Sequence, residues 1–247
     1  MNANALKTDF DRDGFVVVRE FLNAHALAAL NCEIERYVAE VVPMLPRDAV
    51  FYEELDDRST LKHLVRLTAD GYFAALLRDA RFTDLASALL NDGVVPRELQ
   101  WFNKPPRVGK PTPPHQDGYY FMLEPNEAVT AWLALDPVDE RNGCMRYIAG
   151  SHRQPLRPHT RTQTVGFSQG LSYGPDDFAT EVAVSAQPGD LLVHHSMTIH
   201  RADANRSERH RRSLGFVYFA ARAKQEGQRL AAYQESLQRD LAAAGKI

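Results

Sequence analysis

The strongest constraint on the fold is a succession of short strand-like segments between residues 94 and 220 of the 247-residue chain. These segments are rich in β-branched and aromatic residues and are separated by Pro, Gly, Asn and Asp, which is typical of strands joined by turns. The clearest examples are residues 98–102, 129–135, 144–148, 190–194 and 213–220. No helical segment of a βαβ unit separates them, so the pattern predicts a sandwich or barrel of antiparallel strands.

Helices are expected on both sides of this β region. Asn23 can cap a helix over residues 25–42, because its side chain can accept a hydrogen bond from the first helical turn. Two shorter helices are predicted at 61–67 and 82–90, after an early strand at 15–19. The long polar stretch 153–177 is a candidate lid.

We therefore predict one domain over residues 1–247, mainly β with flanking helices. Its expected parts are a helical N-terminal part at about 20–92, a β core at about 94–220 and a C-terminal helix at about 224–243.

Composition excludes several classes of protein. The formal net charge is −3, whereas a protein that binds nucleic acid through its phosphates is usually basic. No apolar run approaches the ~18 residues of a membrane span. Two cysteines are too few for a disulfide scaffold, so a cytoplasmic location is expected. The expected partner is a small-molecule substrate, without nucleic acid or membrane, and the chain is expected to be a monomer or a homodimer.

A first candidate metal-binding element is the His-Gln-Asp sequence at residues 115–117. In a strand, alternate side chains share a face, so His115 and Asp117 would point together while Gln116 points away. Such a pair can chelate a metal with one more ligand. The alternative is a polar strand end that binds nothing.

The third ligand has three candidates, His194, His195 and His200. His194 and His195 are adjacent in a predicted strand and face opposite ways, so at least one of them has another role. Two histidines and one carboxylate form the facial triad of non-haem Fe(II) oxygenases. A zinc hydrolase uses similar ligands and is the chemical rival.

Arg211 distinguishes the two, since an oxygenase that uses 2-oxoglutarate needs a bidentate clamp for the distant carboxylate. The competing interpretation is a solvated basic patch, because five arginines lie between residues 201 and 212. By strand alternation, Arg211 and Arg212 cannot both face solvent.

Several motifs occur here in a characteristic order. They are Asn-Lys-Pro-Pro at 103–106, Pro-His-Gln-Asp at 114–117, Trp132, Asn-Gly at 142–143, Gly-Ser-His at 150–152, Pro-Gly-Asp at 188–190, His200 and Arg211. The ordered set, together with the opening at residues 12–18, resembles the phytanoyl-CoA dioxygenase (PhyH) family over about residues 9–220.

The resemblance implies a double-stranded β-helix, that is, a jelly-roll core of the cupin type, with Fe(II), 2-oxoglutarate and O₂. It implies that His115, Asp117 and His200 bind the iron and act in catalysis. The cosubstrate contacts that it implies are Arg211, Gln100, Trp132 and Lys62.

The chain also departs from the family. Ala202 stands where many members have a serine that helps to bind 2-oxoglutarate, so Arg211 needs another hydroxyl partner, either Ser213 or Thr130. Arg146 occupies a position that is usually apolar or aromatic. It either points outward or meets an anionic substrate, because an unpaired buried charge is costly.

The function expected from these residues is hydroxylation of an unactivated C–H bond of a small metabolite, with secondary metabolism as one source of such substrates. Desaturation or cyclisation with the same cofactors is the alternative, as is a silent metal-binding jelly-roll protein. A halogenase would have Gly or Ala at the carboxylate position, and Asp117 argues against it.

Overall fold

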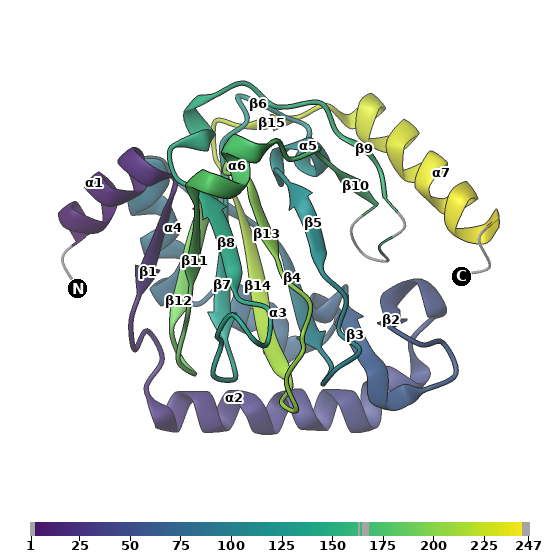
Figure 1. The fold of residues 1–247 in the computed structure, drawn as a ribbon. Helices are drawn as coiled ribbons and strands as arrows, with labels where there is room; N and C mark the ends of the chain where they lie inside the picture. The colour runs from purple at the N-terminus through teal and green to yellow at the C-terminus, as the bar shows by residue number, and fades with distance from the viewer. Residues whose placement is uncertain (1–2, 163, 165–167, 244–247) are drawn as a thin grey trace.

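The computed structural model describes residues 3–162, 164 and 168–243. Two antiparallel sheets form its centre (Figure 1). The larger, seven-stranded sheet has the order β1 (Phe15–Val18), β12 (Leu191–His195), β7 (Ala128–Ala134), β14 (Arg211–Ala220), β4 (Val94–Lys104), β3 (Leu61–Leu64) and β2 (Val50–Tyr52). The smaller, four-stranded sheet has the order β11 (Glu181–Val184), β8 (Met145–Ile148), β13 (His200–Ala202) and β5 (Thr112–His115).

Two small ribbons complete the strands of the described ranges. They pair β9 (Thr160–Arg161) with β10 (Gln169–Gly170), and β6 (Leu123–Glu124) with β15 (Lys224–Gln225).

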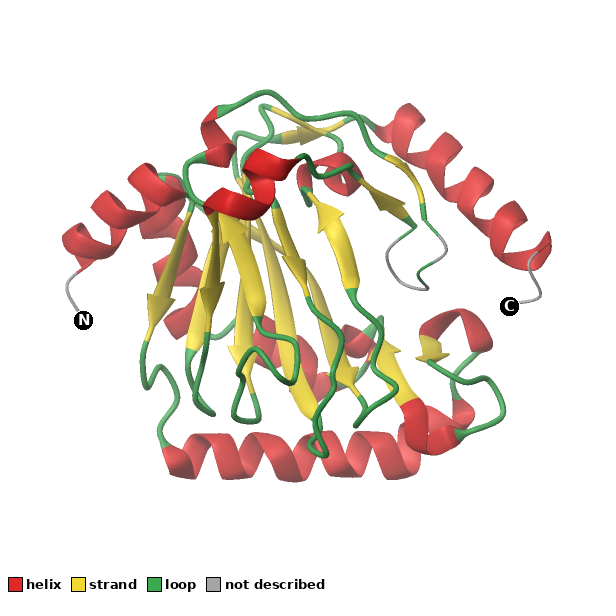
Figure 2. Ribbon diagram, viewed as in Figure 1, coloured by secondary structure: helices red, strands yellow, loops and turns green. Residues whose placement is uncertain are grey.

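Helices lie outside the sheets (Figure 2). They are α1 (Ala3–Asp13), α2 (Ala24–Arg36), α3 (Gly71–Leu77), α4 (Ala80–Leu90), α5 (Gly118–Phe121), α6 (Pro175–Thr180) and α7 (Gly227–Ala243). Helix α2 continues as a π-helical turn at Tyr37–Val41, and short 3₁₀ turns occur at Val42–Met44, Arg47–Ala49, Arg58–Thr60, Leu67–Ala69 and Ser151–Arg153. As expected, the Asn23 side chain caps α2, accepting a hydrogen bond from the Ala26 amide at 2.9 Å.

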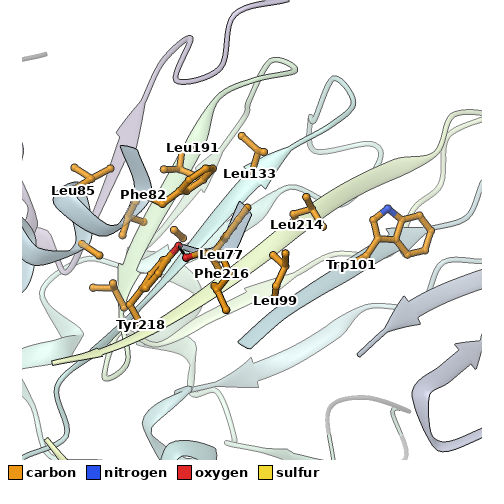
Figure 3. Packing of buried hydrophobic residues seen from close by; sticks show 14 of the residues in the cluster. Leu77, Phe82, Leu85, Leu99, Trp101, Leu133, Leu191, Leu214, Phe216 and Tyr218 are labelled. Carbon is orange, nitrogen blue, oxygen red and sulfur yellow. Dashed lines mark hydrogen bonds between the residues drawn. The ribbon is translucent and has the colours of Figure 1, made fainter. Parts of the chain in front are cut away.

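The main hydrophobic core lies between the larger sheet and the helices (Figure 3). The ring of Phe82 on α4 stacks on that of Phe216 on β14, with 4.2 Å between centroids. The Tyr218 hydroxyl donates to the Leu77 carbonyl at 3.0 Å, so this buried phenol keeps a partner. Burial of such aromatic side chains contributes about 1.5–3 kcal/mol each.

A second apolar cluster fills one end of the space between the two sheets. Its members include Trp132, Cys144, Tyr147, Val184 and Leu192. The opposite end, toward β4, β3 and β5, is lined by polar as well as apolar side chains and contains a cavity. Strand alternation therefore gives the larger sheet an apolar outer face and an inner face that carries functional groups.

The structure confirms the strands predicted from the sequence, the helix that follows Asn23 and the C-terminal helix. The predicted helix at 61–67 is wrong, because residues 61–64 form β3 between β2 and β4. All four residues of β3 are buried, and a short apolar run has no periodicity that separates a buried strand from a helix. The strand expected through His115 and Asp117 ends at His115, so Asp117 lies in the turn that follows. Helices α1 and α3 and strands β2, β11 and β13 were not anticipated.

Candidate metal and cosubstrate site

Three side chains of the predicted metal site converge between the two sheets. His115 ends β5, Asp117 precedes α5, and His200 begins β13 directly opposite His115 in the strand register. The Asp117 Oδ1 atom lies 3.4 Å from His115 Nε2 and 3.8 Å from His200 Nε2. One ligand atom from each residue lies within 4.8 Å of the others, and among the described residues this is the one such group. Asp117 reaches this position from a turn, since β5 has already ended.

Backbone carbonyls orient both imidazoles. His115 Nδ1 donates to the Pro113 carbonyl at 2.8 Å, and His200 Nδ1 donates to the Thr198 carbonyl at 3.0 Å. A carbonyl accepts only, so the proton sits on Nδ1 and the lone pair of Nε2 is directed toward Asp117. Such outer hydrogen bonds fix the tautomer that a metal requires.

The second oxygen of Asp117 is held by two further residues. The Thr130 hydroxyl donates to Asp117 Oδ2 at 2.5 Å, and His194 Nε2 donates to the same oxygen at 3.2 Å. Tyr147 in turn contacts His194 Nδ1 at 3.2 Å. These contacts leave Oδ1 facing the two imidazoles, which is the arrangement of a monodentate carboxylate ligand.

The electrostatics of the triad agree with metal binding. Burial lowers the pKa of His200, helped by the neighbouring His115 and His194, so the imidazole is neutral. Burial alone would raise the pKa of Asp117, but the hydrogen bond that His194 Nε2 donates favours the carboxylate, and the pKa lies well below its usual value. Two neutral imidazoles and one carboxylate suit Fe(II).

The other two candidate histidines have different surroundings. His194 hydrogen-bonds to Asp117 behind the triad, as described above. His195 points away, and its ring lies 6.0 Å from Phe10 and 5.6 Å from His152. The alternation predicted for these two neighbours therefore holds, and the tertiary contacts single out His200.

Arg211 extends from β14 on the inner face of the larger sheet. Its side chain is buried, and its guanidinium lies 5.2 Å from the ring of Trp132. One contact is a long hydrogen bond from Nη1 to the Ser213 hydroxyl at 3.3 Å, while Nε has no partner. Burial lowers the pKa of Arg211 to about 10. Within the described part of the chain no carboxylate forms an ion pair with it, so this site has the chemistry to accept a carboxylate from a ligand.

The neighbouring Arg212 is on the opposite face and is already paired. It donates to the Asp136 carboxylate through Nη2 at 2.7 Å and through its backbone amide at 2.7 Å. The contrast with Arg211 agrees with the alternation predicted from the sequence. Of the two hydroxyl partners predicted for Arg211, Ser213 contacts it, whereas Thr130 donates its hydrogen bond to Asp117.

The remaining predicted cosubstrate contacts differ in their placement. Trp132 packs beside Arg211, and Gln100 lines the cavity, where its Oε1 accepts from His63 Nε2 at 2.7 Å. Lys62 is buried and pairs with Glu53 at 3.1 Å, and it is not among the residues that line the cavity. A contact between Lys62 and 2-oxoglutarate stays a prediction.

Sequence reasoning missed a further buried cation, Lys104. Its Nζ donates to the Lys110 carbonyl at 2.5 Å. Burial, together with Arg211 and Lys62, lowers its pKa well below the usual value. The Asn-Lys-Pro-Pro motif at 103–106 was the available signal, but it gave no indication that the lysine faces Arg211.

A cavity of about 1110 Å³ opens beside the triad. His115, Asp117 and Gln100 line it on the sheet side. The β9–β10 ribbon and α7 contribute the facing wall, and the wall residues from α7 are Leu230, Tyr233, Gln234 and Leu237. The predicted lid at 153–177 includes this ribbon, although residues 163 and 165–167 lie outside the described residues.

Arg146 has no access to this cavity. It points outward from β8 and pairs with Asp203 at 2.6 Å and Glu140 at 2.6 Å. The alternative of an anionic substrate bound by Arg146 is therefore wrong. Among the aromatic side chains, Phe51, Tyr120 and Phe121 line the cavity, whereas Phe216 belongs to the main hydrophobic core.

The site residues from His115 to Arg211 all lie in a region that matches a known protein family. The sequence model described as phytanoyl-CoA dioxygenase (PhyH) matches residues 10–213. The chain belongs to the phytanoyl-CoA dioxygenase family. The family is Fe(II)- and 2-oxoglutarate-dependent and uses O₂, in agreement with the His-Asp-His group and with the predicted cofactors.

Relatives within and beyond the phytanoyl-CoA dioxygenases are similar over most of the chain. The peroxisomal phytanoyl-CoA dioxygenase of Bos taurus is 25% identical over 83% of this chain, which spans 65% of that protein's length. A probable alpha-ketoglutarate-dependent hypophosphite dioxygenase of Stutzerimonas stutzeri is 27% identical, over 85% of this chain and 76% of its own.

Solved structures share the jelly-roll fold predicted for this family member. The epimerase SnoN, in complex with Fe³⁺, alpha ketoglutarate and nogalamycin RO, has a TM-score of 0.72 and 25% identity, covering 90% of this chain and 85% of its own.

In the described ranges, no helix combines the length and apolar character needed to cross a membrane.

Proposed function

We propose that this chain is an Fe(II)- and 2-oxoglutarate-dependent oxygenase that hydroxylates an unactivated C–H bond of a small molecule. The observation that carries the proposal is Arg211, a buried guanidinium without an anionic partner in the described chain, which extends from the larger sheet into the space between the sheets where the triad converges. A zinc hydrolase has no use for this group, whereas 2-oxoglutarate supplies the carboxylate that it lacks.

Each residue has a separate task in the proposal. His115, Asp117 and His200 hold the iron, and Arg211 fixes the distant carboxylate of 2-oxoglutarate beside Trp132. The bound iron and 2-oxoglutarate supply the oxidising chemistry with O₂. The protein orients these groups, keeps Asp117 ionised through Thr130 and His194, and excludes water from the space between the sheets.

Hydroxylation is favoured over halogenation because Asp117 is retained as a ligand, and its Oδ1 faces both imidazoles. Desaturation and cyclisation use the same residues and are the alternative outcomes. The similarity to SnoN, an epimerase by name, supports the shared oxidative chemistry and leaves the outcome to the substrate pocket.

Succinate release tests the core of the proposal. The purified protein, supplied with Fe(II), ascorbate and 2-oxoglutarate, should release succinate slowly, and a substrate should stimulate the release. Screening small metabolites for that stimulation identifies the substrate, including those of secondary metabolism. If no succinate forms with Fe(II) while the protein loaded with Zn²⁺ hydrolyses one of the screened metabolites, the oxygenase assignment is wrong.

The reaction outcome needs a second measurement, mass spectrometry of the product formed under ¹⁸O₂. One incorporated ¹⁸O atom supports hydroxylation. An unlabelled product lighter by two hydrogens assigns a desaturase or cyclase instead, and a chlorinated product contradicts the argument from Asp117.

A further inference from the structure

The wall of the cavity on β3 and β4 carries hydrogen-bond acceptors that the proposed mechanism does not use. Glu98 and His63 both line the cavity, with Gln100 close to each of them. Glu98 forms no ion pair within the described ranges, and His63 is buried. A carboxylate without an ion pair and a buried imidazole with an unpartnered Nδ1 can both accept a hydrogen bond from a molecule in this ligand-sized cavity.

The protonation of His63 follows from its contacts. Its Nε2 lies 2.7 Å from Gln100 Oε1, an atom that only accepts, so Nε2 carries the proton. Burial lowers the pKa of His63 to about 4, so the ring is neutral and its Nδ1 is an acceptor. That Nδ1 is buried and has no hydrogen-bond partner. Stacking on Phe102, with 4.5 Å between centroids, holds the ring in place.

Glu98 lies on the same wall, two residues before Gln100 on β4, and Gln100 interacts with both Glu98 and His63. Burial raises the pKa of Glu98, and the Gln100 amide offsets part of this effect. In the strand register, Val217 pairs with Glu98 on one side and with Thr130 on the other. Glu98 is thus two strand spacings, about 10 Å, from the residue that holds Asp117. A small molecule can span this distance.

The cationic side chains that line the cavity have other partners. Arg66 pairs with Asp48 at 2.7 Å, and Arg97 lies over the Phe219 ring at 5.0 Å and reaches Gln225 at 3.3 Å. Arg161 donates to the Ser236 hydroxyl at 2.9 Å. None of these three forms an ion pair with Glu98 in the described structure.

We propose that Glu98 and His63 recognise the substrate, and that the substrate presents a hydrogen-bond donor to them, either an ammonium or a hydroxyl group. An anionic group at this position would meet a carboxylate and an imidazole lone pair, both unfavourable. The inference rests on the proposed function, because it places the substrate's donor beside Glu98, about 10 Å across the sheet from Thr130, the residue that holds Asp117.

Three probes with a shared frame test this chemistry: 2-(1-naphthyl)ethylamine, 2-(1-naphthyl)ethanol and 1-naphthylacetate. Their binding is measured by anaerobic calorimetry on the protein loaded with Fe(II) and 2-oxoglutarate. We expect the amine to bind at least about tenfold tighter than the carboxylate, with the alcohol between them, as one charge-assisted hydrogen bond predicts.

Variants separate the two acceptors. E98Q keeps the shape and removes the charge, and should weaken amine binding about tenfold while changing alcohol binding less. H63F keeps an aromatic ring at this position but removes the Nδ1 acceptor, and it should weaken binding of the alcohol. E208Q removes an exposed carboxylate paired with Arg107 and is the matched control without effect.

The inference is overturned if the amine binds no tighter than the carboxylate, if it gives no measurable binding at millimolar concentration, or if E98Q leaves the amine-to-carboxylate ratio unchanged. Succinate release without substrate reports the proposed function separately. A protein that releases succinate but shows no preference for donors contradicts this inference alone. A protein that binds the amine but releases no succinate contradicts the oxygenase proposal.

Discussion

The two faces of the larger sheet use alternate residues of the same strands for different purposes. On β14, Leu214, Phe216 and Tyr218 face the helices and are fully buried in the main hydrophobic core. Arg211 and Ser213, which precede them on the strand, face the other sheet, where Arg211 lies over Trp132 and contacts Ser213.

Stability and chemistry thus depend on different faces of this sheet. The outer face contributes apolar burial, whereas the inner face holds a buried cation without an anionic partner in the described chain, which costs free energy of folding. The buried cation therefore lowers the stability of the fold, and apolar burial on the outer face offsets this cost. Substitutions on the inner face should therefore lower activity with little loss of stability. Substitutions on the outer face should lower stability with little loss of activity.

The largest effect is expected at the triad on the inner side. Replacing His115, Asp117 or His200 with Ala should abolish Fe(II)-dependent succinate release, because two remaining ligands rarely hold a labile divalent ion. The fold should persist, since these side chains lie outside the main hydrophobic core. His195→Ala is the control and should retain activity. Loss of iron binding in His195→Ala together with its retention in His200→Ala would mean that the ligand assignment is wrong.

The next largest effect is expected on the outer face. Phe216→Ala removes a ring that stacks on Phe82 and should reduce the free energy of unfolding by about 3–5 kcal/mol. Chemical denaturation measures this loss. The KM for 2-oxoglutarate should stay unchanged at temperatures where the variant is folded, and a large rise in that KM would contradict the separation of the two faces.

Arg211→Ala should weaken cosubstrate binding without lowering stability, which is the reverse of the effect expected for Phe216→Ala. Loss of the charge-assisted contacts to the 2-oxoglutarate carboxylate should raise its KM by about 10- to 100-fold, as measured by succinate release. Stability without ligand should not fall, because the removed charge has no ion-pair partner in the described chain. Arg212→Ala removes the ion pair with Asp136 on the other face and should leave the KM unchanged. Equal effects of the two variants would point to general electrostatics instead of a clamp.

The smallest effect is expected behind the triad. Thr130→Val keeps the volume of the side chain but removes the hydroxyl that donates to Asp117 Oδ2. Loss of one outer hydrogen bond should weaken Fe(II) affinity about tenfold, with little change in the KM for 2-oxoglutarate. Metal titration followed by succinate release checks both values. An unchanged affinity would show that His194 alone suffices to orient the carboxylate.

The sequence by itself determined the local features of this protein. Alternation along short strands indicated the β core, and it separated His194 from His195 and Arg211 from Arg212 correctly, because the two-residue period of a strand depends on the backbone alone. The ordered motifs, from His115 and Asp117 to Arg211, indicated the family. These features involve neighbours in the chain, or family motifs that can be read without knowing which strands pair.

Only the tertiary structure decided which distant groups meet. It made residues 61–64 a strand by pairing them with β4, gave Arg146 its carboxylate partners outside the site, and paired Lys62 with Glu53. It also placed α7 and the β9–β10 ribbon on one wall of the cavity, with Glu98 and His63 among the other lining residues. The physical reason is that strand register and side-chain packing join residues far apart in the chain, and no local periodicity encodes those pairings.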